Sequence, residues 1–157
     1  MNLIVTSSRA PATPTCLIVE DEPLVARALV RQLGALGVRS RSVTSLAELR
    51  GVEGPFDGAI VDLDLPDGSG LDVEAWLPDG SILSKIVFFS ATTRAEARRK
   101  AATQGVFVAK AEGTSQALRA LAGQLARPKQ GAGSGTYVSI SGLPVEGELP
   151  VRKSNPA

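Results

Sequence analysis

The chain has 157 residues, enough for one domain with a proper core, and its 17 basic and 16 acidic residues leave a formal net charge of +1. This balance gives no overall attraction to nucleic acid or anionic lipid. The absence of histidine and the single Cys16 argue against zinc sites, serine–histidine catalysis and a disulfide framework. No apolar run approaches the roughly 20 residues of a membrane span, and residues 1–14 lack the apolar core of a signal peptide. We therefore expect a cytoplasmic protein with neither a nucleic-acid nor a membrane partner.

The first half of the chain alternates between short apolar runs and helical patterns. It begins after a leader rich in Ser, Thr and Pro, residues 1–14, which we expect to be disordered. In chain order we then predict a strand at 16–19, a helix from Pro23 to about Leu36 stopped by Gly37, a strand at 39–43, a short helix opened by the capping-box pattern of Ser45–Glu48, and a strand at 58–61.

The second half repeats this alternation as far as residue 126. We predict, in order, a helix at 71–77, a strand at 85–89, an Ala-rich basic helix at 94–103, a strand at 106–109 and a last helix with an apolar stripe at 118–125. Residues 127–157 are rich in Gly, Ser and Pro, and we expect a flexible tail in which the alternating segment 136–143 could dock on a partner. One domain, residues 15–126, remains between leader and tail.

Five strand–helix units predict an α/β fold with a parallel sheet, because parallel neighbours need crossover helices that cover both faces. The flavodoxin-like, doubly wound order 2-1-3-4-5 suits five units. In that order the first and third strands are neighbours, and ligands bind beyond the carboxyl ends of the strands at this switch point.

Polar side chains stand at the carboxyl ends of four predicted strands. Glu20 and Asp21 follow the first, Asp62 the third, Ser90 the fourth and Lys110 the fifth. Carboxylates at the ends of hydrophobic strands are costly unless a cation or a reaction uses them. Oxygen-only ligands favour a hard cation such as Mg²⁺. Together the acids, the hydroxyl and the ammonium predict a site for a metal and a phosphoryl group.

This pattern resembles the receiver domain of bacterial two-component response regulators over residues 15–126. The family's motifs are matched in order by an acidic pair (Glu20 and Asp21), a phosphoacceptor (Asp62) with a Leu-Pro-Asp-Gly loop (Leu65–Gly68), a hydroxyl (Ser90), a switch aromatic (Phe107) and a lysine (Lys110). Each motif is weak alone, but all of them in the right order on the right units are specific.

The resemblance implies a phosphoacceptor switch rather than an enzyme, with at most slow autophosphorylation from small donors and slow autodephosphorylation. Asp62 would accept a phosphoryl group from a sensor histidine kinase or a histidine phosphotransfer protein. Mg²⁺ would be held by Glu20, Asp21, Asp62 and the backbone carbonyl of Asp64. Ser90, Lys110 and Phe107 would respond to the phosphoryl group. Because no effector domain fits after residue 126, a single-domain regulator that acts by contact with a downstream protein is expected.

Two other functions remain open. The first is an interaction module that resembles a receiver but is not phosphorylated, suggested by Ala111, which replaces the family's proline after the lysine. A cis bond before a non-proline residue costs roughly 2.5–4 kcal/mol, so a trans bond is expected there. The second is a haloacid-dehalogenase-like phosphatase that uses Asp62 and Asp64. Pro66 departs from its motif, and that family places its nucleophile after the first strand.

Several polar residues are assigned ordinary structural roles. Glu22 is interpreted as a helix cap, and the side chain of Asp64 is expected to face solvent. Gly68–Gly70 is not a dinucleotide-binding loop, because a third glycine is missing. The basic residues of the fourth helix are interpreted as a solvated face; they are Arg94, Arg98, Arg99 and Lys100.

Overall fold

A computed structural model describes residues 13–79, 81 and 85–126. The expected tail at 127–157, with its alternating segment, lies outside the described residues, as does the expected leader except for residues 13 and 14. Within the described part of the chain, no helix has both the length and the apolar character needed to cross a bilayer.

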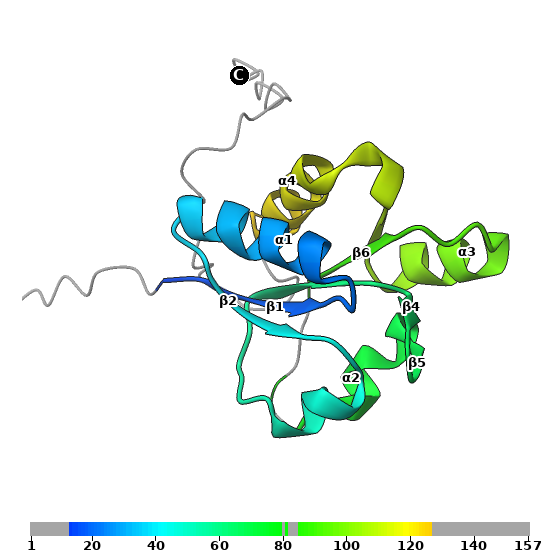
Figure 1. Ribbon diagram of the computed structural model, residues 1–157, viewed down its shortest axis with the longest axis horizontal. Coiled ribbons are helices and arrows are strands. Elements are labelled where there is room, and N and C mark those ends of the chain that lie inside the picture. Colours follow the sequence, from blue (N-terminus) through cyan, green and yellow to red (C-terminus); the bar gives the residue numbers. More distant parts are fainter. Residues whose placement is uncertain (1–12, 80, 82–84, 127–157) are drawn as a thin grey trace, which may run out of the picture.

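Five parallel strands form the central sheet (Figure 1). They are β1 (Thr15–Val19), β2 (Arg39–Val43), β3 (Gly58–Val61), β6 (Ile86–Ser90) and β7 (Val106–Ala109). Their order is β2-β1-β3-β6-β7, which is the predicted 2-1-3-4-5 order when the strands of this sheet are counted alone. The flavodoxin-like, doubly wound α/β fold is therefore confirmed, with its switch point between β1 and β3.

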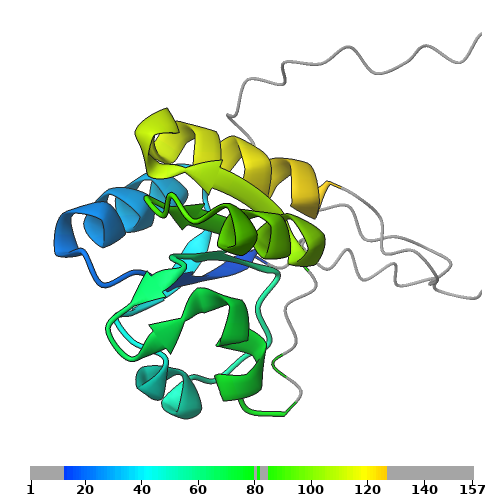
Figure 2. The ribbon, with the colours of Figure 1, turned by 90° about the vertical axis from the view of Figure 1, so that its right-hand side faces the viewer.

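Helical segments cover both faces of the sheet (Figures 1 and 2). One face, here called the α1–α4 face, carries α1 (Pro23–Ala35) and α4 (Thr114–Leu125). The other, called the η1–α2–α3 face, carries the 3₁₀ turn η1 (Ala47–Gly51), α2 (Val73–Trp76) and α3 (Ala95–Gln104). Two further 3₁₀ turns, η2 (Gly70–Asp72) and η3 (Lys110–Glu112), follow β5 and β7.

The apolar core is divided by the sheet into two clusters. Along β1, Leu17 and Val19 belong to the cluster under the η1–α2–α3 face, whereas Cys16 and Ile18 belong to the cluster under the α1–α4 face. This alternation follows from the two-residue period of a strand. All residues of β3 and β6 are buried, as expected for central strands of a parallel sheet with helices on both sides.

Two predicted helices take a different form. The segment after Ser45 is a 3₁₀ turn rather than an α-helix, and only half of its capping box is present. The backbone N–H of Glu48 donates to Ser45 Oγ at 3.4 Å, but the Glu48 carboxylate accepts from Thr44 instead. The helix predicted at 71–77 is the turn η2 followed by the single-turn α2. It ends at Trp76 because Leu77 precedes Pro78 and is extended.

The loop after Asp62 is also more structured than predicted. It forms a small antiparallel pair, β4 (Asp64–Leu65) and β5 (Gly68–Ser69), which the sequence pattern did not predict. The chain then returns to the end of β3 at Gly70. A Cβ atom at Gly70 would lie 2.0 Å from the backbone oxygen of Asp62, so only glycine allows this approach. The backbone of Asp62 is thus held by its own loop.

Candidate functional site

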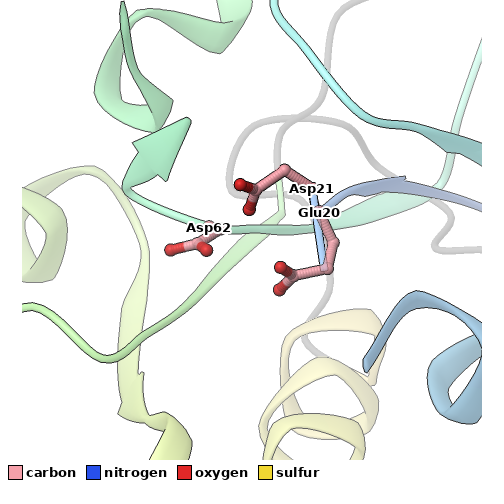
Figure 3. A group of neighbouring side chains, drawn as sticks. All are labelled: Glu20, Asp21 and Asp62. Carbon is pink, nitrogen blue, oxygen red and sulfur yellow. The ribbon is translucent and has the colours of Figure 1, made fainter. Parts of the chain in front are cut away.

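Three carboxylates meet at the carboxyl ends of β1 and β3. The ligand oxygens of Glu20, Asp21 and Asp62 all lie within 4.8 Å of one another, and Figure 3 shows the three carboxylates turned to the same side of the strand ends. Glu20 is 2% exposed and Asp62 5%, whereas Asp21 is exposed. The backbone N–H of Glu20 donates to Val43 O and that of Asp62 to Val19 O, so the hydrogen bonding of the sheet fixes both positions.

Lys110 supplies a positive charge to these acids from the end of β7. Its Nζ lies 2.9 Å from Asp62 Oδ2 and 3.0 Å from Glu20 Oε2, and its side chain is 15% exposed. Burial alone would lower the pKa of Lys110, but its contacts with Asp62 and Glu20 outweigh this effect and raise the pKa above the usual range. The lysine therefore stays charged and partly neutralises the acids.

One ammonium does not balance all the carboxylates. Burial raises the pKa of Glu20 to about 7, and the charge of Asp62 adds to this effect, while the N–H of Glu22 and the ammonium of Lys110 oppose it. Near neutral pH, Glu20 is thus only partly ionised. A divalent cation would favour its charged form.

The donor set fits a hard cation. All three side chains offer carboxylate oxygens, and two of them are almost completely buried within reach of a common point. Oxygen ligands of this kind suit Mg²⁺ or Ca²⁺ rather than a metal that prefers nitrogen or sulfur. The acidic pocket could therefore bind a metal, as the sequence predicted.

Asp62 is the acid with the most defined surroundings. Its Oδ2 accepts from Lys110, and its Oδ1 accepts from the backbone N–H of Asp64 at 3.2 Å. The Asp62 carboxylate is thus oriented from both sides. Asp21, beside it, is exposed to solvent. A carboxylate oriented in this way can act as a nucleophile.

Ser90 and Phe107 do not contact the acids in this structure. Ser90 ends β6 with no exposed surface, and its Oγ accepts from the backbone N–H of Thr92 at 3.3 Å. Phe107 lies on β7 opposite Phe88 and is only partly buried against the core. The structure thus brings together four of the predicted site residues: Glu20, Asp21, Asp62 and Lys110. Ser90 and Phe107 lie beside them on the neighbouring strands β6 and β7.

Glu22 and Asp64 lie where the sequence predicted, but each also makes a contact that the sequence did not predict. Glu22 is the N-cap residue of α1, as predicted, but its side chain makes no capping hydrogen bond; its Oε2 lies 3.4 Å from Lys110 Nζ instead. The Asp64 side chain is 51% exposed and faces solvent as predicted, and its Oδ1 also forms a surface ion pair with Arg94 Nη2 at 3.0 Å. Each contact joins segments that are far apart in the sequence, so no local pattern reveals it.

The four basic residues at the start of α3 and along it are exposed, as predicted for a solvated face, and three of them also have polar partners. Arg94 binds Asp64, Lys100 pairs with Glu96, and Arg98 donates to the backbone oxygen of Thr92. Thr92 was not among the predicted site residues. Its Oγ1 accepts from Arg94, and its backbone N–H donates to Ser90. A Ser-x-Thr pattern at the end of a strand was the available signal for this turn.

The bond after Lys110 is trans, as the substitution of proline by Ala111 predicted. Among the described residues the cis bond is Gly54–Pro55. Lys110 nevertheless reaches Asp62 and Glu20, and it begins the turn η3, where the Glu112 carboxylate accepts from the backbone N–H of Ala109 at 2.9 Å.

Fold and site together define a flavodoxin-like domain with an acidic pocket at its switch point. The family model of the response regulator receiver domain matches residues 16–122, and the chain belongs to this family. Receiver domains are in general phosphoacceptors of two-component systems rather than enzymes. The resemblance inferred from the strand-end residues is therefore confirmed.

Individual relatives agree with this assignment. The response regulator protein PilR of Pseudomonas aeruginosa is 40% identical over 63 residues, which are 39% of this chain and only 14% of PilR. The non-phosphorylated HemR receiver domain from Leptospira biflexa is 28% identical, with a TM-score of 0.62 over 73% of this chain and 98% of that domain. A response regulator from Burkholderia pseudomallei, solved with a phosphorylated aspartic acid, calcium and citrate, is 25% identical, with a TM-score of 0.54 over 69% of this chain and 66% of that one.

Proposed function

We propose that Asp62 accepts a phosphoryl group from a phosphohistidine on a sensor histidine kinase or a histidine phosphotransfer protein. The observation that carries this proposal is the buried Asp62 carboxylate, with Lys110 Nζ 2.9 Å from its Oδ2 at the carboxyl ends of the strands. The phosphorus–nitrogen bond of the donor breaks as a carboxylate oxygen bonds to phosphorus. The electron pair stays on the imidazole, which takes a proton from water, and Asp62 becomes an acyl phosphate.

The other site residues respond to the new charge. Lys110, released from the phosphorylated carboxylate, pairs with a phosphoryl oxygen. Ser90 gives up its bond from Thr92 and donates its hydroxyl to another phosphoryl oxygen. Phe107 then turns inward and changes the surface formed by α3, β7 and α4, which contacts a downstream protein. Hydrolysis by water resets the domain slowly.

Mg²⁺ would be held by Asp21 and Asp62, with Glu20 and the backbone carbonyl of Asp64 completing the ligands. The bound cation offsets the charge of the acids, which otherwise repels an incoming phosphoryl group. The structure of the Burkholderia relative, which contains a phosphorylated aspartic acid and a calcium ion, supports this proposal by analogy.

Residues 15–126 are proposed to be the unit that carries this chemistry in the cytoplasm, with the segments on either side dispensable for it. A chain truncated at Gln130 should therefore fold and accept phosphate as the full chain does. Loss of folding or of phosphorylation in the truncated chain would place the tail within the domain.

The direct test is incubation with acetyl phosphate and Mg²⁺, followed by intact-mass measurement. The wild type should gain one phosphoryl group and Asp62→Asn none. Asp64→Asn is the matched control, because that carboxylate is paired with Arg94 and should not be required. A phosphoryl group that survives in Asp62→Asn would refute the assignment. A folded wild type that never gains one would favour the interaction module, and steady turnover of para-nitrophenyl phosphate would favour the phosphatase.

The metal site has a separate test. Mg²⁺ should raise the melting temperature of the wild type, because a ligand that binds only the folded state stabilises it. This increase should be strongly reduced in Asp21→Asn and unchanged in Asp79→Asn, an exposed aspartate distant in sequence from the pocket. An equal increase in Asp21→Asn and the wild type would contradict the proposed ligand set.

A further inference from the structure

A continuous set of contacts connects the loop after β6 with the ring of Phe107. Thr92 lies at its centre: its backbone N–H donates to Ser90 Oγ at 3.3 Å, and its backbone oxygen accepts from Arg98 Nε at 2.8 Å. Ser90 and Thr92 are 0% and 5% exposed. The backbone N–H and the backbone oxygen of Thr92 are therefore both hydrogen-bonded. A shift of Thr92 must affect both Ser90 and Arg98.

Arg98 extends this set of contacts to the neighbouring strand. Its guanidinium carbon lies 5.1 Å from the centroid of the Phe107 ring, within the range of a cation–π interaction. Because the guanidinium is planar and its Nε is bonded to Thr92, the orientation of the plane over the ring is set by the loop. Arg98 thus touches both the loop and the ring.

We propose that Arg98 is a positioning residue that couples the loop after Ser90 to the ring of Phe107 and holds the ring in its half-buried resting position. This inference rests on the proposed function, because a phosphoryl group on Asp62 is what draws Ser90 away from Thr92. The departure of Ser90 leaves a buried N–H on Thr92 without a partner, which is costly unless the loop moves. A moving loop carries Arg98 with it and releases the ring.

A direct route across the strands is the competing explanation. Ser90 pairs in register with Ala109 and Phe88 with Phe107, so Ser90 and Phe107 are offset by two residues on adjacent strands. Side chains at such diagonal positions can influence each other without an intermediary. The two routes differ in one respect: only the proposed one requires Arg98.

The experiment uses the full chain labelled with para-fluorophenylalanine and read by fluorine NMR. The chain has four phenylalanines, and Phe107→Leu identifies the line of Phe107. Variants are Ser90→Ala, Arg98→Gln, their combination, and Arg98→Lys as a conservative replacement. Arg99→Gln is the matched control, because Arg99 is on the same helix and has no hydrogen bond, ion pair or ring contact among the described residues.

In the resting protein, Arg98→Gln should displace the Phe107 line, Arg98→Lys should displace it less, and Arg99→Gln should leave it unchanged. Ser90→Ala should displace the Phe107 line when Arg98 is present. When Ser90→Ala is added to Arg98→Gln, the line should move little further, which is the signature of coupled sites. Equal effects of Ser90→Ala in both backgrounds would overturn the proposal in favour of the direct route. This arm gives a result whether or not Asp62 is phosphorylated.

After treatment with acetyl phosphate and Mg²⁺, the wild type and Arg98→Gln should gain the same mass, while the movement of the Phe107 line on phosphorylation should be clearly smaller in Arg98→Gln. The same movement in both proteins would also overturn the coupling. Failure of the wild type to gain mass would instead overturn the proposed function, and the resting-state comparison would still decide the role of Arg98.

Discussion

The two faces of the sheet are built differently. The α1–α4 face has helices of 13 and 12 residues, and α4 alone buries four side chains against the sheet. The η1–α2–α3 face has a 3₁₀ turn of five residues, an α-helix of four and a helix of ten that buries only Ala97 and Ala101. One face relies on long apolar stripes, and the other on short segments.

Polar contacts compensate for the short segments. On the η1–α2–α3 face, Asp67 accepts from the backbone at the start of η1, Arg50 lies over Trp76 at 4.6 Å, and Arg98 lies over Phe107 at 5.1 Å. Each contact of this kind contributes modestly to stability and can be exchanged for another. A packed apolar stripe, in contrast, cannot be rearranged without disrupting the core. The face that carries the proposed switch is therefore the one whose contacts can change.

The largest effect on stability is expected at Gly70, whose backbone lies against the backbone of Asp62 on the η1–α2–α3 face. In Gly70→Ala the new methyl group would overlap the Asp62 oxygen, so the loop must move or the chain unfold. We expect a loss on the order of 3 kcal/mol or more in the free energy of unfolding, measured with urea. The control Gly123→Ala lies in α4, where the new Cβ would meet no described atom within 4 Å apart from the helix's own backbone, and it should stabilise by about 0.5–1 kcal/mol. A mild effect of Gly70→Ala would show that this loop is not held as described.

A second comparison places the same substitution on each face. Leu121 in α4 and Leu49 in η1 are both fully buried. Leu121→Ala should cost about 2–5 kcal/mol in the free energy of unfolding, because a long packed helix cannot collapse onto the cavity. Leu49→Ala should cost less, because a five-residue turn can shift toward the space that is left. Equal losses, with equal urea dependence, would mean that the two faces are equally rigid.

The sequence was sufficient for the sheet and the acidic pocket. Apolar runs of four or five residues define four of the five strands, β2 being mostly polar, and crossover helices require the strands to be parallel. Parallel strands end at a common edge, so Glu20, Asp21, Asp62 and Lys110 had to be neighbours once the order was assigned. These conclusions need only the positions of residues along their strands.

The remaining features depend on contacts between distant segments. The form of η1 could not be predicted from 45–48, because Asp67, about twenty residues further on, binds its first N–H groups. The Arg98–Phe107 contact depends on where a long side chain ends, which helical periodicity does not specify. Glu22 occupies the N-cap position of α1 that the sequence predicts, but no local pattern indicates that its carboxylate lies 3.4 Å from Lys110 Nζ.

The smallest effect is expected at Asp67, which tests whether polar contacts hold η1. Its two carboxylate oxygens each accept a backbone N–H, from Leu46 and Ala47, at 2.9 Å. These bonds lower the pKa of Asp67 below its usual value. The ionised form is thus favoured in the folded state, and its contribution to stability is present above the unfolded pKa of about 4 and is lost as the pH falls through the folded pKa.

Asp67→Asn retains one acceptor oxygen and loses the charge, so it should be less stable than the wild type at neutral pH. The difference in the free energy of unfolding should shrink as the pH falls below about 4, because the wild-type carboxyl group then becomes protonated. Thermal unfolding at a series of pH values measures this difference, with Asp79→Asn, an exposed residue outside these contacts, as the control. A difference that does not vary with pH would mean that the charge of Asp67 is not what holds η1, and that this face depends on apolar packing as the opposite face does.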